Sequence, residues 1–288
     1  MNFITAYTSG LKTVFSKGKL WLLLYALNFL FAIFLAYPLS GMLGAKLGHT
    51  LAAETLFDRF NFAFSNDFIN VYGDAFGVVM NQSIVGIGLY LLLSVFLVGG
   101  ILNVLKTNEK IGSLSNFWSG GGKYFWRMLR LTIYFFLMQI AILVLFFMLF
   151  STLTAGGLER FHNEGEILQI GLIILPFYFL VATIFFMIHD YAKIHLVATD
   201  KNFLFQPIKQ AFGWVFKNFS QTFLLYLLNL LTFGLFFFIY LQLDGGTAIL
   251  AVFLIGQFFV LARIGTKLLN LASATEIVST TVTQLCEL

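Results

Sequence analysis

The sequence predicts an all-α integral membrane protein whose chain crosses the bilayer six times. Of its 288 residues, 59% are hydrophobic and 10% are charged, against roughly 45–50% and about 25% in soluble domains. Six apolar runs each exceed the ~18 residues that a helix needs to cross the hydrocarbon core. The short alternating segments of a membrane β-barrel do not occur, so we expect the spans to be helices.

The six predicted spans belong to a single membrane domain, residues 1–288. The first, residues 20–42, has about 23 residues, whereas the apolar part of a cleavable signal sequence has roughly 7 to 15. We therefore expect it to remain as a transmembrane helix. The others are residues 83–105, 128–153, 167–189, 220–243 and 247–268.

Basic residues are distributed unevenly between the two sides that these spans define. Fourteen of the 17 Lys and Arg residues fall in the N-terminal segment, the second and fourth connecting regions and the C-terminal end. Because Lys and Arg collect on the cytoplasmic side of membrane proteins, both termini are expected to be cytoplasmic. The same bias explains the net charge of +4, and no nucleic-acid partner is expected.

An amphipathic segment lies between the fourth and fifth spans. On a helix its residues form a polar stripe and an opposite apolar stripe: Gln206, Lys209, Gln210, Gly213 and Lys217 against Phe205, Ile208, Phe212, Val215, Phe216 and Phe219. The pattern predicts a helix in the membrane interface, with Lys209, Trp214 and Lys217 at the lipid headgroups. The alternative is an ordinary helix packed on a soluble domain, and the sequence contains no such domain.

The same arrangement precedes the first span. Ile4, Tyr7, Leu11, Val14 and Phe15 oppose a polar stripe, which predicts a second interfacial helix. Its basic residues Lys12, Lys17 and Lys19 are assigned to the headgroups.

A third basic and aromatic segment precedes the third span. It assigns Lys123, Trp126 and Arg127 to the headgroups in the same way. The SGGGKY run at residues 119–124 lacks the GxxxxGK[ST] spacing of a phosphate-binding loop. It is interpreted as a flexible break in the third interfacial helix.

Internal similarity connects these segments. Residues 14–30 align with residues 215–231 with identity at 8 of 17 positions, including Asn28 with Asn229. The sequence therefore predicts three parallel repeats of an interfacial helix, a span out and a span back. Their approximate bounds are residues 1–108, 109–200 and 201–288.

The run FFMIHDYAKIHLVATDKN at residues 185–202, followed by FGWVFKNF and LLYLL, resembles the membrane domain attached to some glycerophosphodiester phosphodiesterases. It is also similar to related uncharacterised multi-pass proteins of bacteria. The resemblance is strong over about residues 185–228 and departs from the family pattern at Lys193, where arginine is commoner. It implies a bacterial cytoplasmic-membrane protein without an established activity, and the chain has no room for the phosphodiesterase catalytic domain.

Two groups of polar residues lie at or within the spans. Asp190 is expected to pair either with Lys193, three residues away on the same helix, or with Arg263 on the last span. Asn28 and Asn229 lie about two turns inside their spans, where amides usually join helices by hydrogen bonds. A polar lining for a substrate path is the alternative interpretation of the two asparagines.

No arrangement typical of catalysis or metal binding is present in the sequence. The single cysteine, Cys286, excludes an internal disulfide, and no HExxH motif or carboxylate cluster indicates a metal. We expect neither an enzyme nor a cofactor. The external loop, residues 44–82, is expected to contain two short helices split near Ser65 and Asn66.

The sequence leaves two function classes open. The first is a non-enzymatic scaffold, accessory subunit or lipid-interacting component, with anionic lipid headgroups as partners and other membrane protein subunits as candidate partners. The second is a transporter or lipid-handling protein with a substrate path at the repeat interface. The few ionisable residues within the spans favour the first class.

Overall fold

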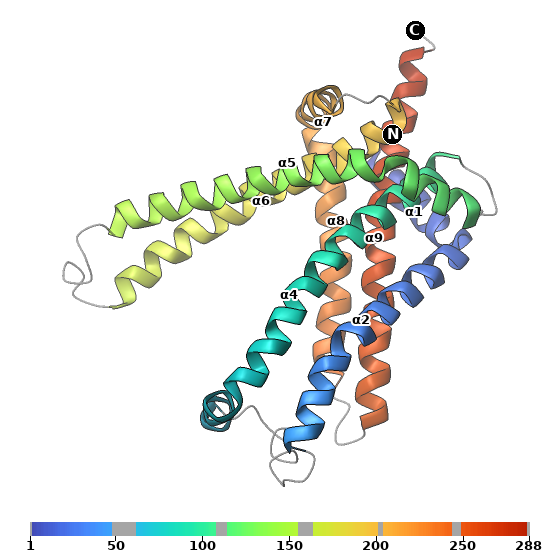
Figure 1. The fold of residues 1–288 in the computed structure, drawn as a ribbon. Coiled ribbons are helices and arrows are strands. Elements are labelled where there is room, and N and C mark those ends of the chain that lie inside the picture. The colour runs from blue at the N-terminus through green and yellow to red at the C-terminus, as the bar shows by residue number, and fades with distance from the viewer. Residues whose placement is uncertain are drawn as a thin grey trace. The chain divides into compact units, whose positions relative to one another are not determined.

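The computed structural model describes residues 2–47, 62–107, 114–154, 164–200, 204–243 and 249–286, and in this part of the chain every regular element is a helix (Figure 1). The short helices are α1 (Phe3–Ser16) and α7 (Phe205–Lys217). The long ones are α2 (Gly18–Leu47), α4 (Phe62–Lys106), α5 (Leu114–Thr154), α6 (Glu164–Thr199), α8 (Phe219–Gln242) and α9 (Ile249–Cys286).

The six long helices confirm the prediction of six apolar helices able to cross a membrane. Most of them extend beyond the predicted runs: α5 begins 14 residues before residue 128 and α6 continues ten residues past residue 189. Hydropathy marks where a helix is apolar, whereas the backbone hydrogen bonds continue until a residue interrupts them. The helices therefore carry polar as well as apolar segments.

Two of the predicted interfacial helices are separate helices that end at equivalent positions. Helix α1 is followed by the cap residue Lys17, with φ −103° and ψ 36°, and α2 begins at the next residue. Helix α7 is followed by the cap residue Asn218, with φ −116° and ψ 32°, and α8 begins at the next residue. Lys17 and Asn218 occupy the same position in the alignment of residues 14–30 with 215–231.

The third predicted interfacial segment is different, because α5 runs without a break from Leu114 to Thr154. The prediction of a flexible break at residues 119–124 is therefore wrong. A Cβ atom on Gly121 would lie 2.6 Å from the Phe96 ring of α4, and one on Gly120 would overlap the side chain of Asn103. The glycines allow two helices to approach closely, and helical hydrogen bonds keep the backbone regular.

The described chain forms two compact units. One contains residues 22–94, the larger part of α2 with most of α4. Within it the Tyr90 hydroxyl donates a hydrogen bond to Asn28 Oδ1 at 2.7 Å. The rings of Phe31 and Tyr90 lie 5.4 Å apart, and Leu35 fills the space beside Gly86.

The other unit contains residues 1–21 and 95–288. In it α1 packs on α9, α5 on α6, α6 on α7, and α8 on α9. The buried side chains come mainly from the end of α4, the first half of α5, the end of α6, α7 and the last part of α9: Leu102, Phe117, Tyr124, Met128, Leu131, Met187, Leu196, Ile208, Val215, Leu271 and Ile277. These segments are the predicted cytoplasmic ends of the spans.

Elsewhere the spans expose their apolar side chains. Only 6% of the most apolar window of α5 is buried, and 11% of that of α8. In water such surfaces would drive aggregation, whereas lipid covers them at no cost. The exposed apolar helices are therefore consistent with a multi-pass membrane protein.

The described part of the predicted external loop is helical, and two helical parts of α4 meet there at a kink. Helix α4 begins at Phe62 and passes through Ser65 and Asn66, so the predicted split there is wrong. Its one irregular residue is Tyr72, with φ −118° and ψ 21°. Residues 48–61 lie outside the described part of the chain.

Candidate functional site

Helix α7 is held on the protein by one face. Pro207, Ile208, Ala211 and Val215 are buried, and α7 packs mainly on α6. Small and β-branched residues on that face let the two helices lie close together. Pro207 is in the first turn, where its missing N–H leaves no hydrogen bond unmade.

The remaining surface of α7 carries both rings and charges. Phe205 is 78% exposed and Phe216 is 59% exposed, and the side chains of Lys209 and Lys217 are exposed as well. Half of the predicted apolar stripe therefore packs on the protein, while the other half remains uncovered. A helix with an uncovered aromatic edge next to lysines suits the interface between hydrocarbon and headgroups.

Trp214, which the sequence predicts to lie at the headgroups, is half-buried. Its ring packs 4.8 Å from that of Tyr191 on α6 and touches the cluster formed by Ala6, Leu225 and Ile277. An amphipathic pattern cannot distinguish a tryptophan facing lipid from one facing another helix. Trp214 therefore anchors α7 to the protein.

Helix α1 packs on α9 through its smallest residues. Ala6 and Gly10 are buried, and a Cβ atom on Gly10 would lie 2.9 Å from the Cβ of Ser273. Ile4 and Phe15, which belong to the predicted apolar stripe, remain exposed. Like α7, α1 contacts the protein along one face and leaves large apolar side chains on another.

The lysines of the N-terminal segment have different environments. Lys12 and Lys19 are exposed, as a headgroup contact requires. Lys17 is only 8% exposed, and its Nζ donates a hydrogen bond to the carbonyl oxygen of Val104 at 2.7 Å. Because Val104 lies in the last turn of α4, the lysine satisfies a carbonyl that the helix itself leaves free. Lys17 therefore differs from Lys12 and Lys19 in being buried and hydrogen-bonded to the protein.

In the third predicted interfacial segment, which forms the start of α5, Lys123 and Arg127 share one carboxylate. Lys123 Nζ lies 2.5 Å from Asp200 Oδ2, and Arg127 lies 2.9 Å from Oδ1. Asp200 follows the end of α6 with φ 50°, a left-handed conformation that aspartate tolerates and that often ends helices. The two cations, Lys123 first, hold the pKa of Asp200 below its ordinary value. Trp126 is exposed.

Asp190 pairs with Lys193 and not with Arg263. Lys193 Nζ lies 2.9 Å from Asp190 Oδ1, and Asn270 Nδ2 donates to Asp190 Oδ2 at 3.1 Å. The intrahelical alternative predicted from the sequence is the one formed. Asn270 on α9, which the sequence did not single out, connects α6 to α9. Its signal was an amide in an apolar run, the same signal that identified Asn229.

Asn28 and Asn229 make similar hydrogen bonds. Each donates to the carbonyl oxygen four residues earlier, Asn28 to Leu24 at 2.7 Å and Asn229 to Leu225 at 3.0 Å. Each also reaches the returning helix of its own hairpin: Asn28 accepts from Tyr90, and Asn229 donates to Asn270 Oδ1 at 3.4 Å. Both amides therefore join helices.

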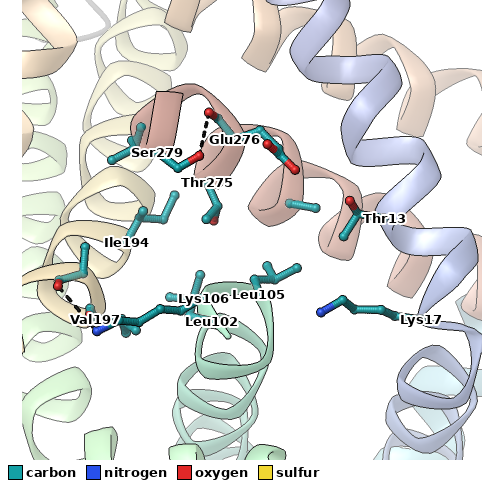
Figure 2. Close-up of a pocket in the computed structure, with 13 residues that line it drawn as sticks. Thr13, Lys17, Leu102, Leu105, Lys106, Ile194, Val197, Thr275, Glu276 and Ser279 are labelled. Atoms are coloured by element: carbon teal, nitrogen blue, oxygen red, sulfur yellow. Dashed lines mark hydrogen bonds between the residues drawn. The ribbon is translucent and has the colours of Figure 1, made fainter. Parts of the chain in front are cut away.

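A pocket of about 370 Å³ lies between α1, α4, α6 and α9 in the larger unit (Figure 2). Figure 2 shows Lys106 reaching Val197, whose carbonyl oxygen accepts its hydrogen bond at 2.9 Å, while Lys17 extends into the pocket from the other side. Thr275 and Glu276 of α9 line the pocket. Like Lys17, Lys106 satisfies carbonyls at a helix end, here that of α6, and so offsets the partial negative charge there.

Comparison with known proteins gives no relative: no protein-family model, curated protein or solved structure matches this chain. Among the described residues, no group of three or more His, Cys, Asp or Glu side chains is placed to hold a metal ion.

Proposed function

We propose that this chain is a non-enzymatic component of a bacterial cytoplasmic membrane, acting as a scaffold, accessory subunit or lipid-interacting protein. In this proposal its cytoplasmic face carries helices that rest against the inner leaflet and bind anionic headgroups. The observation that carries the proposal is the surface of α7, where Phe205 and Phe216 are exposed beside exposed Lys209 and Lys217.

Because one face of α7 packs on α6, the helix already has a fixed position from which its other face could contact the membrane. The buried face of α7 fixes it to α6, so the helix does not have to fold on binding the membrane, and no ordering cost opposes binding. Each lysine near an anionic surface contributes about 1 kcal/mol, and each exposed phenylalanine adds apolar area.

The proposed three-repeat organisation is supported by the equivalence of α1 and α7. At aligned positions of the two helices, Val14 and Val215 are both buried, and Phe15 and Phe216 are both exposed. Both helices end at the same aligned position, and Asn28 and Asn229 form corresponding hydrogen bonds. The middle repeat would differ by fusing its interfacial segment with its first span in α5.

The alternative function, a transporter or lipid-handling protein, is favoured by the pocket between α1, α4, α6 and α9. Its volume of about 370 Å³ and its lining by Lys17, Lys106 and Glu276 would suit a small polar molecule. Ala198→Trp, which would fill this pocket, would abolish uptake if the pocket were the substrate site. It would leave a scaffold function unchanged.

Electron paramagnetic resonance in bilayers tests the placement of α7. In a Cys286→Ser background, a nitroxide would be attached at Phe216→Cys and, in a second variant, at Lys209→Cys. The label at position 216 is expected to collide mainly with oxygen, which concentrates in lipid. The label at position 209 is expected to collide mainly with a water-soluble nickel chelate.

The two labels differ only in their face of α7, so each serves as the control of the other. If both collide mainly with the nickel chelate, α7 lies in water and the proposed membrane contact is wrong. If both collide mainly with oxygen, α7 is buried in the membrane and its lysines do not meet the headgroups.

A further inference from the structure

Helix α9 carries two neighbouring cations at its surface. Arg263 and Lys267 are one helical turn apart, and both side chains are exposed at the protein surface. In the described part of the chain neither forms an ion pair with a carboxylate. Both lie within the candidate span 250–279, where an uncompensated charge is costly.

The nearest carboxylate is already occupied. Asp190 Oδ1 binds Lys193 and Oδ2 accepts from Asn270. Lys267 interacts electrostatically with Asp190, Lys193 and Arg263. Lys193 and Lys267 therefore share one carboxylate, and Arg263 adds a third positive charge close to Lys267, so this group has an excess of two positive charges. An anion from outside the chain would complete this group.

A pocket beside these cations has both polar and apolar walls. It has a volume of about 240 Å³ between α8 and α9, and Arg263, Lys267, Leu230 and Phe233 line it. Asn229 also lines it; this residue is 6% exposed, and its Oδ1 is buried without a hydrogen-bond partner. The wall therefore offers two cations for an anion, an acceptor for a hydroxyl group and an apolar surface.

We propose that this pocket binds the headgroup of an anionic glycerophospholipid that carries a hydroxyl group. The phosphate would bind Arg263 and Lys267, since a guanidinium can hold two phosphate oxygens at once. The headgroup hydroxyl would donate to Asn229 Oδ1, and the acyl chains would run along Leu230, which is exposed. The site lies on α9, apart from α7, and depends on the proposed function only in requiring that the chain lies in a membrane.

A lipid fits these walls better than free phosphate does. A small anion would use the two cations and leave the apolar wall of Leu230 and Phe233 without an occupant. The same helix also exposes large apolar side chains on the N-terminal side of the cations, such as Leu254 and Phe258. A phospholipid that enters from the bilayer has both a charged headgroup for the cations and acyl chains for the apolar wall.

Native mass spectrometry of the full-length chain in a non-ionic detergent tests this site. The probes are phosphatidylglycerol, phosphatidylcholine with the same acyl chains, inorganic phosphate and glycerol 3-phosphate. The wild-type chain is expected to retain phosphatidylglycerol and not the other three. Arg263→Gln with Lys267→Gln is expected to weaken this binding about 30-fold, since each basic residue near a headgroup contributes roughly fivefold.

The matched control is Lys209→Gln with Lys217→Gln, which removes the same charge from α7 and should leave the site intact. Equal retention of phosphatidylglycerol by both double variants would overturn the proposal, as would equal retention of phosphatidylcholine by the wild type. Binding of inorganic phosphate alone would assign the site to a free anion instead of a lipid. If the first double variant does not fold, Leu230→Trp keeps both charges, fills the pocket and should also lose the lipid.

This outcome is separable from that of the proposed function. Loss of the lipid site with normal oxygen collisions at position 216 would reject only the pocket on α9. Retention of the lipid with nickel collisions at both labels would reject only the membrane contact of α7.

Discussion

Lys17 illustrates how one lysine can serve the fold while its neighbours remain at the surface. Its ammonium lies 2.7 Å from the Val104 carbonyl, 87 residues away in the chain, whereas Lys12 and Lys19 are exposed. The stem of a lysine is long enough to cross a helix end, and a terminal carbonyl is a strong acceptor. At the residue scale, some basic side chains thus satisfy helix ends, some pair with carboxylates, and others remain exposed.

Lys17→Met is expected to lower the stability of the protein by about 2 kcal/mol, because it leaves the buried Val104 carbonyl without this donor. The measurement is thermal unfolding in detergent. Lys19→Met removes the same charge from an exposed position and should change the midpoint little. Equal effects of the two substitutions would show that the Lys17 hydrogen bond does not stabilise the fold.

Asp200 should make stability sensitive to acid. Its pKa is lowered mainly by the hydrogen bond from Lys123 and also by Arg127. Its stabilising contribution is therefore full above the ordinary pKa of 3.8 and is lost as the pH falls through the lower folded-state value.

The measurement compares thermal unfolding of the wild type and of Asp200→Asn between pH 7 and pH 3. The wild type should be the more stable at pH 7, and the two midpoints should converge in acid. A difference that stays constant with pH would exclude this carboxylate as the cause.

At the scale of elements, the start of α5 shows why a run of glycines is ambiguous in sequence. A flexible break and a close helix contact both require small residues, and only the neighbouring helix distinguishes them. Gly120 faces Asn103 of α4, while a Cβ atom on Gly122 would meet nothing within 4 Å. The run therefore has a packed side and an open side.

Gly120→Ala is expected to destabilise the protein by roughly 1 to 3 kcal/mol, since the added methyl group overlaps Asn103 close to the α4 backbone. Gly122→Ala is the matched control and should stabilise α5 by about 0.5 to 1 kcal/mol. Thermal unfolding of both variants provides the test. Stabilisation by both would mean that α5 is not packed on α4 at this point.

At the scale of the whole molecule, burial is unevenly distributed along the spans. The buried core lies at the ends of the spans that carry most Lys and Arg residues, and the other parts of the spans expose apolar side chains. A chain of this kind gains little from burying Leu and Phe between spans, because lipid is equally apolar. Packing therefore concentrates where polar groups, helix ends and short helices meet.

The predicted orientation can be tested by cysteine labelling of intact cells. In a Cys286→Ser background, a membrane-impermeant maleimide is expected to label Asp74→Cys in the predicted external loop and not Lys209→Cys on α7. Labelling of both after the cells are broken would be the control for reactivity. Labelling of position 209 from outside would reverse the assignment of α7 to the inner face.

The sequence by itself determined the six apolar helices, the existence of α7 and the uneven distribution of basic residues. These properties depend on local composition and on the period of the apolar residues. Both can be recognised without knowing which residues are neighbours in space. It also identified Asn28 and Asn229 as joining residues and included the Asp190–Lys193 pair, whose members are three residues apart.

Only the tertiary structure decided which face of each amphipathic helix the protein covers. It turned Trp214 inward, buried Lys17, bound Lys123 and Arg127 to Asp200, and left Arg263 and Lys267 beside a pocket. The physical reason is that these outcomes depend on residues tens of positions apart in the chain. Helix packing brings them together, and a periodic pattern carries no information about the partner.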